Sequence, residues 1–219
     1  MNKHLQDTKW AENVILVDAD YADKVAFNLI TNFERMLERR IPSADFAQWM
    51  ECVAIDGGMQ PLNPGEGKGD TQQTQVILTH GKGKMRMDYF VPADFETELN
   101  GKAFNGRMGE FLIGCYPVEV IADGERLLTE ILSIVVAREE VKRVMVIANT
   151  EDADIYNKVR EALKLADSKR QVVTVFSMDP SGASLGRKAN FGVEILGYSL
   201  MAALGIRGEE ISERLGARG

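Results

Sequence analysis

Short apolar runs alternate along this chain with longer segments whose apolar residues recur every three or four positions. Residues 14–17 and 144–148 are continuous apolar runs, and residues 172–176 are apolar except for Thr174, a composition typical of strands buried on both faces of a parallel sheet. Segments with helical periodicity follow each of the first two runs, and another spans residues 127–136. This alternation predicts an α/β fold, doubly wound, with a mostly parallel sheet and helices on both faces.

The remaining elements are predicted from shorter patterns. Residues 43–50 are expected to form a helix with Ser43 as its N-cap. Residues 52–55, 111–115 and 118–121 have the composition of strands. Residues 196–204 predict a last helix, after a polar loop over 177–190, and the charged last dozen residues are expected to fray.

Residues 57–116 interrupt the alternation of strands and helices. Two strand-like runs, 76–79 and 85–90, flank a glycine-rich link and predict an antiparallel hairpin. No internal repeat or linker is visible, so we expect a single domain over residues 1–219 with an inserted hairpin region at about 57–116.

A phosphate-binding loop is excluded at residues 65–70, because Leu62 stands where its first glycine is required and Gly69 where Ser or Thr is required.

Composition and charge narrow the classes of function. The 219 residues are 45% hydrophobic and 27% charged, which is enough for a packed core, and the net charge is -7. An acidic protein repels phosphate backbones, so contact with RNA needs a local basic patch, and Lys82, Lys84 and Arg86 are the densest cluster. The polar N-terminus and the lack of an apolar run of about 18 residues predict a cytoplasmic protein with no membrane contact.

The cysteines and histidines exclude other kinds of site. Cys52 and Cys115 each lie in an apolar run and are expected to be small buried hydrophobic residues, not a disulfide or zinc site. His4 and His80 are the only histidines, so a histidine-rich metal cluster is excluded. We expect His80 to be a loop residue that follows a strand.

Acidic residues follow several of the predicted strands. Asp18 and Asp20 end the first run, Asp123 precedes a long apolar helix, and Asp152 and Asp154 follow the central run. In open α/β sheets the site lies beyond the carboxyl ends of the strands, so these carboxylates are expected to converge and to share a cation, Mg2+ or Mn2+. The alternative is local, because aspartate is also a common helix N-cap, and Asp20, Asp123 and Asp152 could each serve only that purpose.

Three segments resemble the NYN branch of the PIN-like nuclease fold. Residues 15–20 (ILVDAD) are similar to the first strand of that family, residues 146–155 (VIANTEDADI) to its later strand, and residues 118–123 (VEVIAD) to its acidic helix start. The resemblance covers residues 14–56 and 118–178. It implies a Mg2+-dependent ribonuclease with the following ligands and catalytic residues: Asp18, Asp123, Asp152 and Asp154.

The chain departs from the family pattern at two places. Residues 149–151 replace the small Ser-Gly approach to the later acids, and the Lys-Gly that precedes the middle acid is absent, so Glu125 or Glu130 could take the place of Asp123. Two other interpretations stay open. One is a non-catalytic binding or assembly module, homo-oligomeric through the last helix, and the other is a Toprim-like domain, which needs a Glu where Asp18 stands.

Overall fold

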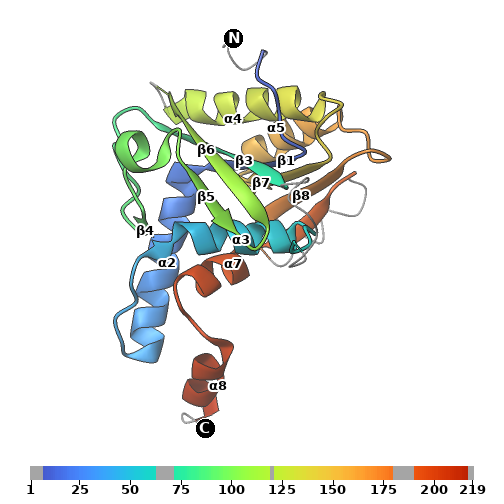
Figure 1. The fold of residues 1–219 in the computed structure, drawn as a ribbon. Helices are drawn as coiled ribbons and strands as arrows, with labels where there is room; N and C mark the ends of the chain where they lie inside the picture. The colour runs from blue at the N-terminus through green and yellow to red at the C-terminus, as the bar shows by residue number, and fades with distance from the viewer. Residues whose placement is uncertain (1–6, 63–71, 119–120, 180–189, 217–219) are drawn as a thin grey trace.

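Seven strands form one mixed sheet in the computed structural model, which describes residues 7–62, 72–118, 121–179 and 190–216 (Figure 1). The strands of this sheet are, in chain order, β1 (Asn13–Asp18), β3 (Gln73–Gly81), β5 (Ala103–Gly106), β6 (Gly109–Val118), β7 (Arg143–Ile147), β8 (Val172–Ser177) and β9 (Gly192–Ile195). Two short strands, β2 (Ala44–Asp45) and β4 (Phe90–Val91), pair separately.

Helices follow most of the strands. They are α2 (Ala19–Leu37), α3 (Phe46–Asp56), the π-helical turn η1 (Phe95–Leu99), α4 (Ile121–Val136), α5 (Ala153–Leu163), α7 (Leu196–Ala203) and α8 (Gly208–Gly216). No helix in the described ranges is both long and apolar enough to cross a bilayer.

The sheet order is β5-β6-β3-β1-β7-β8-β9, and every neighbouring pair except β5 and β6 is parallel. The chain starts in the middle at β1, adds β3 and β6 on one side, and then crosses to add β7, β8 and β9 on the other. The six parallel strands therefore have the order 3-2-1-4-5-6 of a doubly wound nucleotide-binding sheet. The predicted fold class is confirmed.

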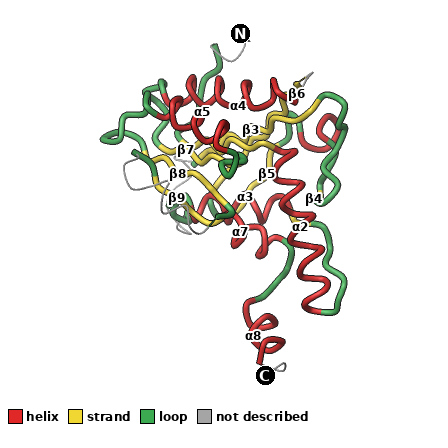
Figure 2. Tube along the Cα trace, turned by 180° about the vertical axis from the view of Figure 1, so that it is seen from behind, coloured by secondary structure: helices red, strands yellow, loops and turns green. Residues whose placement is uncertain are grey.

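Two hydrophobic cores lie on opposite faces of the sheet. Alternation along β1 sends Ile15 and Val17 into the core under α2, α3 and α7, and sends Val14 and Leu16 into the core under α4 and α5. Both figures show the sheet between these two helical layers (Figures 1 and 2). The cores fix the sheet rigidly, so the ends of its strands are defined positions for functional side chains.

Helix α8 lies outside the two layers, next to the end of α2, in both views. None of its residues is buried. It is attached through charged groups: Glu210 pairs with Arg39 at 2.7 Å, and Arg214 pairs with Glu38 at 2.8 Å. The prediction that the last dozen residues fray was wrong for the part that α8 covers.

The prediction of a strand at residues 52–55 was also wrong, because these residues belong to α3. The side chains that α3 buries recur at helical spacing: Phe46, Trp49, Met50, Val53 and Ala54. Residues 52–55 alone look like a strand, and the helical stripe is visible only when Phe46 and Trp49 are included. Asp45, not Ser43, caps this helix and accepts a hydrogen bond from the Gln48 amide at 3.0 Å.

The antiparallel hairpin exists, but it is formed by β5 and β6, and the predicted pair 76–79 and 85–90 was wrong. Strand β3 is internal and parallel to both β1 and β6. Residues after Gly81 leave the sheet because Asp23 of α2 binds the Lys84 ammonium and the amides of Asp88 and Tyr89.

Two separate strands were expected at residues 111–115 and 118–121, but residues 111–115 and 118 lie in the single strand β6. The strand continues through Pro117 because β5 no longer pairs with β6 at that position. Strand β9 was not predicted, and most of the expected loop 177–190 lies outside the described residues. The phosphate-loop segment 65–70 also lies outside them. Helix α7 forms where residues 196–204 predicted it.

Candidate functional site

The carboxyl edge of the sheet has its switch point between β1 and β7, the two strands at which the chain changes direction across the sheet. Val17 of β1 lies opposite Ile147 of β7 in a parallel register. Asp18 and the segment 148–152 therefore leave the sheet side by side and at the same level. The first and the last acidic segments of the sequence, separated by more than a hundred residues, are brought together here.

Each of these segments begins a helix, and an aspartate caps it. Asp18 is the N-cap of α2 and accepts a hydrogen bond from the Tyr21 amide at 3.0 Å. Asp152 is the N-cap of α5 and accepts hydrogen bonds from the amides of Asp154 and Ile155 at 2.9 and 3.3 Å. The capping alternative is confirmed for Asp152. Capping leaves further lone pairs on each carboxylate, so a capping aspartate can also bind a cation.

Asp20 was a candidate helix cap in the sequence, but its carboxylate contacts a neighbouring strand. It lies in the first turn of α2, and its Oδ2 accepts a hydrogen bond from the Gly81 amide at 2.7 Å. Its Oδ1 lies 3.8 Å from the Lys84 ammonium. Asp20 therefore joins the end of β1 to the end of the neighbouring strand β3.

Tyr21 lies between the two acidic segments. Burial raises the pKa of its phenol, and the negative charges of Glu151 and Asp18 raise it further. Glu151 and Asp18 are therefore both near enough to the Tyr21 hydroxyl for their charges to act on it. In the sequence, Glu151 stood out only as a departure from the nuclease pattern. Its negative charge at this edge of the sheet was therefore missed.

Thr150 supplies an unusual polar group at the same turn. Its side chain is 4% exposed, and its Oγ1 has no hydrogen-bond partner among the described residues. A buried hydroxyl without a partner is costly, and such groups are concentrated at sites that bind a ligand, ion or water. This orphaned hydroxyl, next to Glu151 and Asp152, is what a site for a hydrated cation would use.

The other expected ligands are less central. Asp154 lies in the exposed first turn of α5. Asp123 lies in the first turn of α4, which starts beyond β6 on this edge, but its side chain is outside the described part of the structure, as is that of Glu125. Within that part, no three acidic, histidine or cysteine side chains gather closely enough to hold a metal ion. A cation at this edge would therefore have at most two of the described side chains as ligands, and the expectation of Mg2+ or Mn2+ stays a prediction.

Of the three basic residues expected to contact RNA, Lys84 approaches the acidic edge, at 3.8 Å from Asp20. Lys84 lies 2.6 Å from the buried carboxylate of Asp23 and is largely committed to it. Lys82 and Arg86 have exposed side chains. Arg86 forms an isolated antiparallel β-bridge with Asp94, and its charge also helps to lower the pKa of the Asp94 carboxyl.

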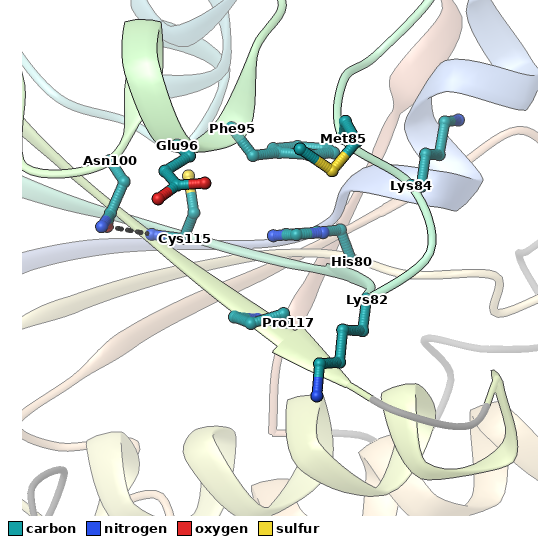
Figure 3. Close-up of a pocket in the computed structure, with 9 residues that line it drawn as sticks. All are labelled: His80, Lys82, Lys84, Met85, Phe95, Glu96, Asn100, Cys115 and Pro117. Atoms are coloured by element: carbon teal, nitrogen blue, oxygen red, sulfur yellow. Dashed lines mark hydrogen bonds between the residues drawn. The ribbon is translucent and has the colours of Figure 1, made fainter.

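A pocket of about 320 Å³ opens beside these residues, at the carboxyl ends of β3 and β6 (Figure 3). Its lining residues are His80, Lys82, Lys84, Met85, Phe95, Glu96, Asn100, Cys115 and Pro117. The sequence did not suggest this pocket, because its walls come from β3, β6, η1 and the segment after Gly81. His80, expected in a loop, is instead the penultimate residue of β3 and is 8% exposed.

The two cysteines differ in their surroundings. Both are free and only partly buried, whereas they were expected to be buried. Burial raises the pKa of the Cys115 thiol to about 12, so it is an uncharged part of the pocket wall at neutral pH. Cys52 lies on α3, and burial followed by the charges of Asp56 and Glu51 raises its pKa as well.

The fold and the site define a doubly wound α/β protein with acidic helix starts at its switch point and an enclosed pocket next to them. The chain belongs to a family of unknown function, DUF6621, whose model matches residues 7–211. No curated protein and no solved structure matches the chain.

Proposed function

We propose that this protein is a Mg2+- or Mn2+-dependent ribonuclease that hydrolyses phosphodiester bonds at the carboxyl edge between β1 and β7. The observation that carries the proposal is the register of these two strands, which brings Asp18 beside the segment that contains Asp152. The resemblance of both segments to the NYN branch of the PIN-like nucleases supports the same assignment.

The residues have separate roles in this proposal. Asp18 and Asp152 hold the cation, and Asp123 and Asp154 complete its environment from the starts of α4 and α5. A bound divalent cation lowers the pKa of its water and neutralises charge on the phosphate. The buried Thr150 hydroxyl orients a water molecule, and the N-terminal ends of α2 and α5 favour the approach of an anionic phosphate.

A specific observation favours a second candidate, a binding or assembly module that kept the fold without catalysis. Asp18 and Asp152 each hydrogen-bond to amides of their own helix, which explains both residues without a metal. Assembly through the last predicted helix has less support, because α7 buries most of its apolar side chains and presents Tyr198, 67% exposed, as a large apolar group.

The test separates capping from cation binding with Asp152→Asn. Asparagine caps helices about as well as aspartate, so this variant keeps the cap and loses the charge. A cation at ten times its Kd stabilises the native state by about 1.4 kcal/mol, which for a chain of this size raises Tm by roughly 3–6 °C. We expect that shift, and cleavage of single-stranded RNA, in the wild type and not in Asp152→Asn.

Asp45→Asn is the matched control, because Asp45 caps α3 with a 3.0 Å hydrogen bond of the same kind. It should keep both the Mg2+ shift and RNA cleavage. Equal shifts in wild type and in both variants would exclude a metal at Asp152. A wild type that neither responds to Mg2+ or Mn2+ nor cleaves RNA would leave the non-catalytic module as the better description.

A further inference from the structure

The pocket beside β3 and β6 has the size and shape for a small planar ligand. Its volume of about 320 Å³ is at the lower end of the range for small-molecule sites. Its walls are mainly apolar and include the aromatic rings of His80 and Phe95, which stack 3.8 Å apart with an interplanar angle of 8°. Pro117 lies opposite His80 in the register of β3 and β6. The rings of Phe95 and His80 cover each other and are 2% and 8% exposed, so a planar heterocycle would pack against the apolar wall that they form and not between them.

The polar groups of the pocket form a donor–acceptor pair. The Oδ1 atom of Asn100 accepts a hydrogen bond from the Cys115 amide at 2.9 Å, which fixes the side chain and leaves its NH2 group as the donor that it offers to a ligand. Glu96, on η1, contributes a carboxylate acceptor on the same side of the pocket (Figure 3). The Watson–Crick edge of each RNA base carries a donor beside an acceptor, so this pair is complementary to a nucleobase.

His80 adds a second acceptor. Its Nδ1 lies 3.0 Å from the Gly81 carbonyl, which can only accept, so Nδ1 carries the proton in the neutral ring. The other ring nitrogen, Nε2, is then an acceptor, and it faces Cys115 across the cavity (Figure 3). Lys82 also lines the pocket, and its side chain runs past Pro117 and away from Asn100 and Glu96, so its charge lies outside the cavity, where it suits the phosphate that a nucleotide carries (Figure 3).

The pocket and the acidic edge are adjacent. Strand β6 is separated from β1 by β3 alone, which is about 10 Å, or two strand spacings. Lys84 lines the pocket and lies 3.8 Å from Asp20 in the first turn of α2. A single nucleotide can therefore have its base in the pocket and its phosphate near Asp18.

We infer that this pocket holds a nucleobase of single-stranded RNA, next to the phosphodiester at the switch point. This inference rests on the proposed function for its choice of RNA as the substrate. Apolar contact with the pocket wall and the Asn100–Glu96 pair would hold the base, and Lys82 would attract its phosphate. Because all four bases present a donor beside an acceptor, the pocket positions the strand with little preference for sequence.

The test measures binding of a fluorescent RNA pentamer in EDTA, with the four nucleoside monophosphates as competitors, so that hydrolysis plays no part. Asn100→Asp keeps the oxygen that accepts from the Cys115 amide and replaces the NH2 donor with a second oxygen. We expect about tenfold weaker binding, from one lost hydrogen bond and a new repulsion of the phosphate. Asn105→Asp, with the same charge change on the exposed strand β5, should bind like the wild type.

A second measurement does not depend on that variant. In a Cys52→Ser background, Cys115 is the remaining thiol, and bound nucleotide should slow its modification by a small thiol reagent at least fivefold. Equal affinities of Asn100→Asp and Asn105→Asp, or no protection of Cys115, would overturn the inference. Binding that requires Asn100 in a protein that does not cleave RNA would retain the base pocket and reject only the ribonuclease.

Discussion

Replacing Asp23 with alanine removes the carboxylate that ties residues 84–89 to helix α2. This carboxylate is 2% exposed and has three partners: the Lys84 ammonium at 2.6 Å, the Asp88 amide at 3.0 Å and the Tyr89 amide at 2.9 Å. The segment that it holds carries Lys84 and Met85, which are two walls of the pocket. The variant therefore tests both the stability of the fold and the integrity of the pocket.

The cost follows from what each partner loses. Two partly buried amides without an acceptor cost about 1 kcal/mol each, the low end of the range for an unpaired buried group. Lys84 is 32% exposed and can be hydrated, so losing its counterion adds less than about 1 kcal/mol. We expect Asp23→Ala to lower the free energy of unfolding by about 2–3 kcal/mol, and Tm by roughly 4–12 °C.

Urea unfolding followed by circular dichroism measures this loss, and Asp88→Ala is its control. Asp88 has an exposed side chain in the same segment, and alanine there keeps the amide that binds Asp23, so its effect should be within about 0.5 kcal/mol. Asp23→Asn, which keeps one acceptor oxygen, should lie between the two. A loss below about 1 kcal/mol in Asp23→Ala would refute the reasoning, because the three hydrogen bonds would then not hold the segment.

Two further predictions concern the strand that supports the pocket. Gly109 has φ +104, and a Cβ there would collide with the Gln72 carbonyl, so Gly109→Ala should lower the free energy of unfolding by at least about 2 kcal/mol, whereas Gly83→Ala, with open space around it, should have little effect in the same urea titration. Burial raises the pKa of Cys115 from 9.0 to about 12, so the unfolded chain releases this proton first and stability should fall as pH rises from about 9 towards 12. Cys115→Ala should make that fall shallower, and identical pH profiles of the two proteins would contradict the assignment.

The order of strands and helices was predictable to the extent that each element carries its own pattern. Strands β1, β7 and β8 are buried on both faces, and their continuous apolar runs are visible without any partner. Helices α2, α4 and α5 are long enough to display their stripes. Most errors lie in residues 43–118, where short runs were read apart from their neighbours, as with residues 52–55 of α3, and the others are β9 and the part of the chain end that α8 covers.

Only the acidic residues of the candidate site were predictable from the sequence. An aspartate that ends a strand or soon follows it is visible in the sequence, and Asp18 and Asp152 were singled out in this way. Tyr21 and the buried Thr150 hydroxyl gain their significance from burial, which residue types do not reveal. The commitment of Lys84 to Asp23 is a contact between distant segments, and its strength depends on the burial of the carboxylate.

By itself, the amino-acid sequence determined the class of the fold, since the alternation of apolar strands and amphipathic helices depends on local periodicity and on burial against any neighbour. It also determined which strands end in acids. Only the tertiary structure decided that β1 and β7 are adjacent, that Asp23 anchors the segment after Gly81, and that four separate elements enclose the pocket. The physical reason is that strand order and side-chain contacts arise from packing between residues far apart in the chain, which no local pattern records.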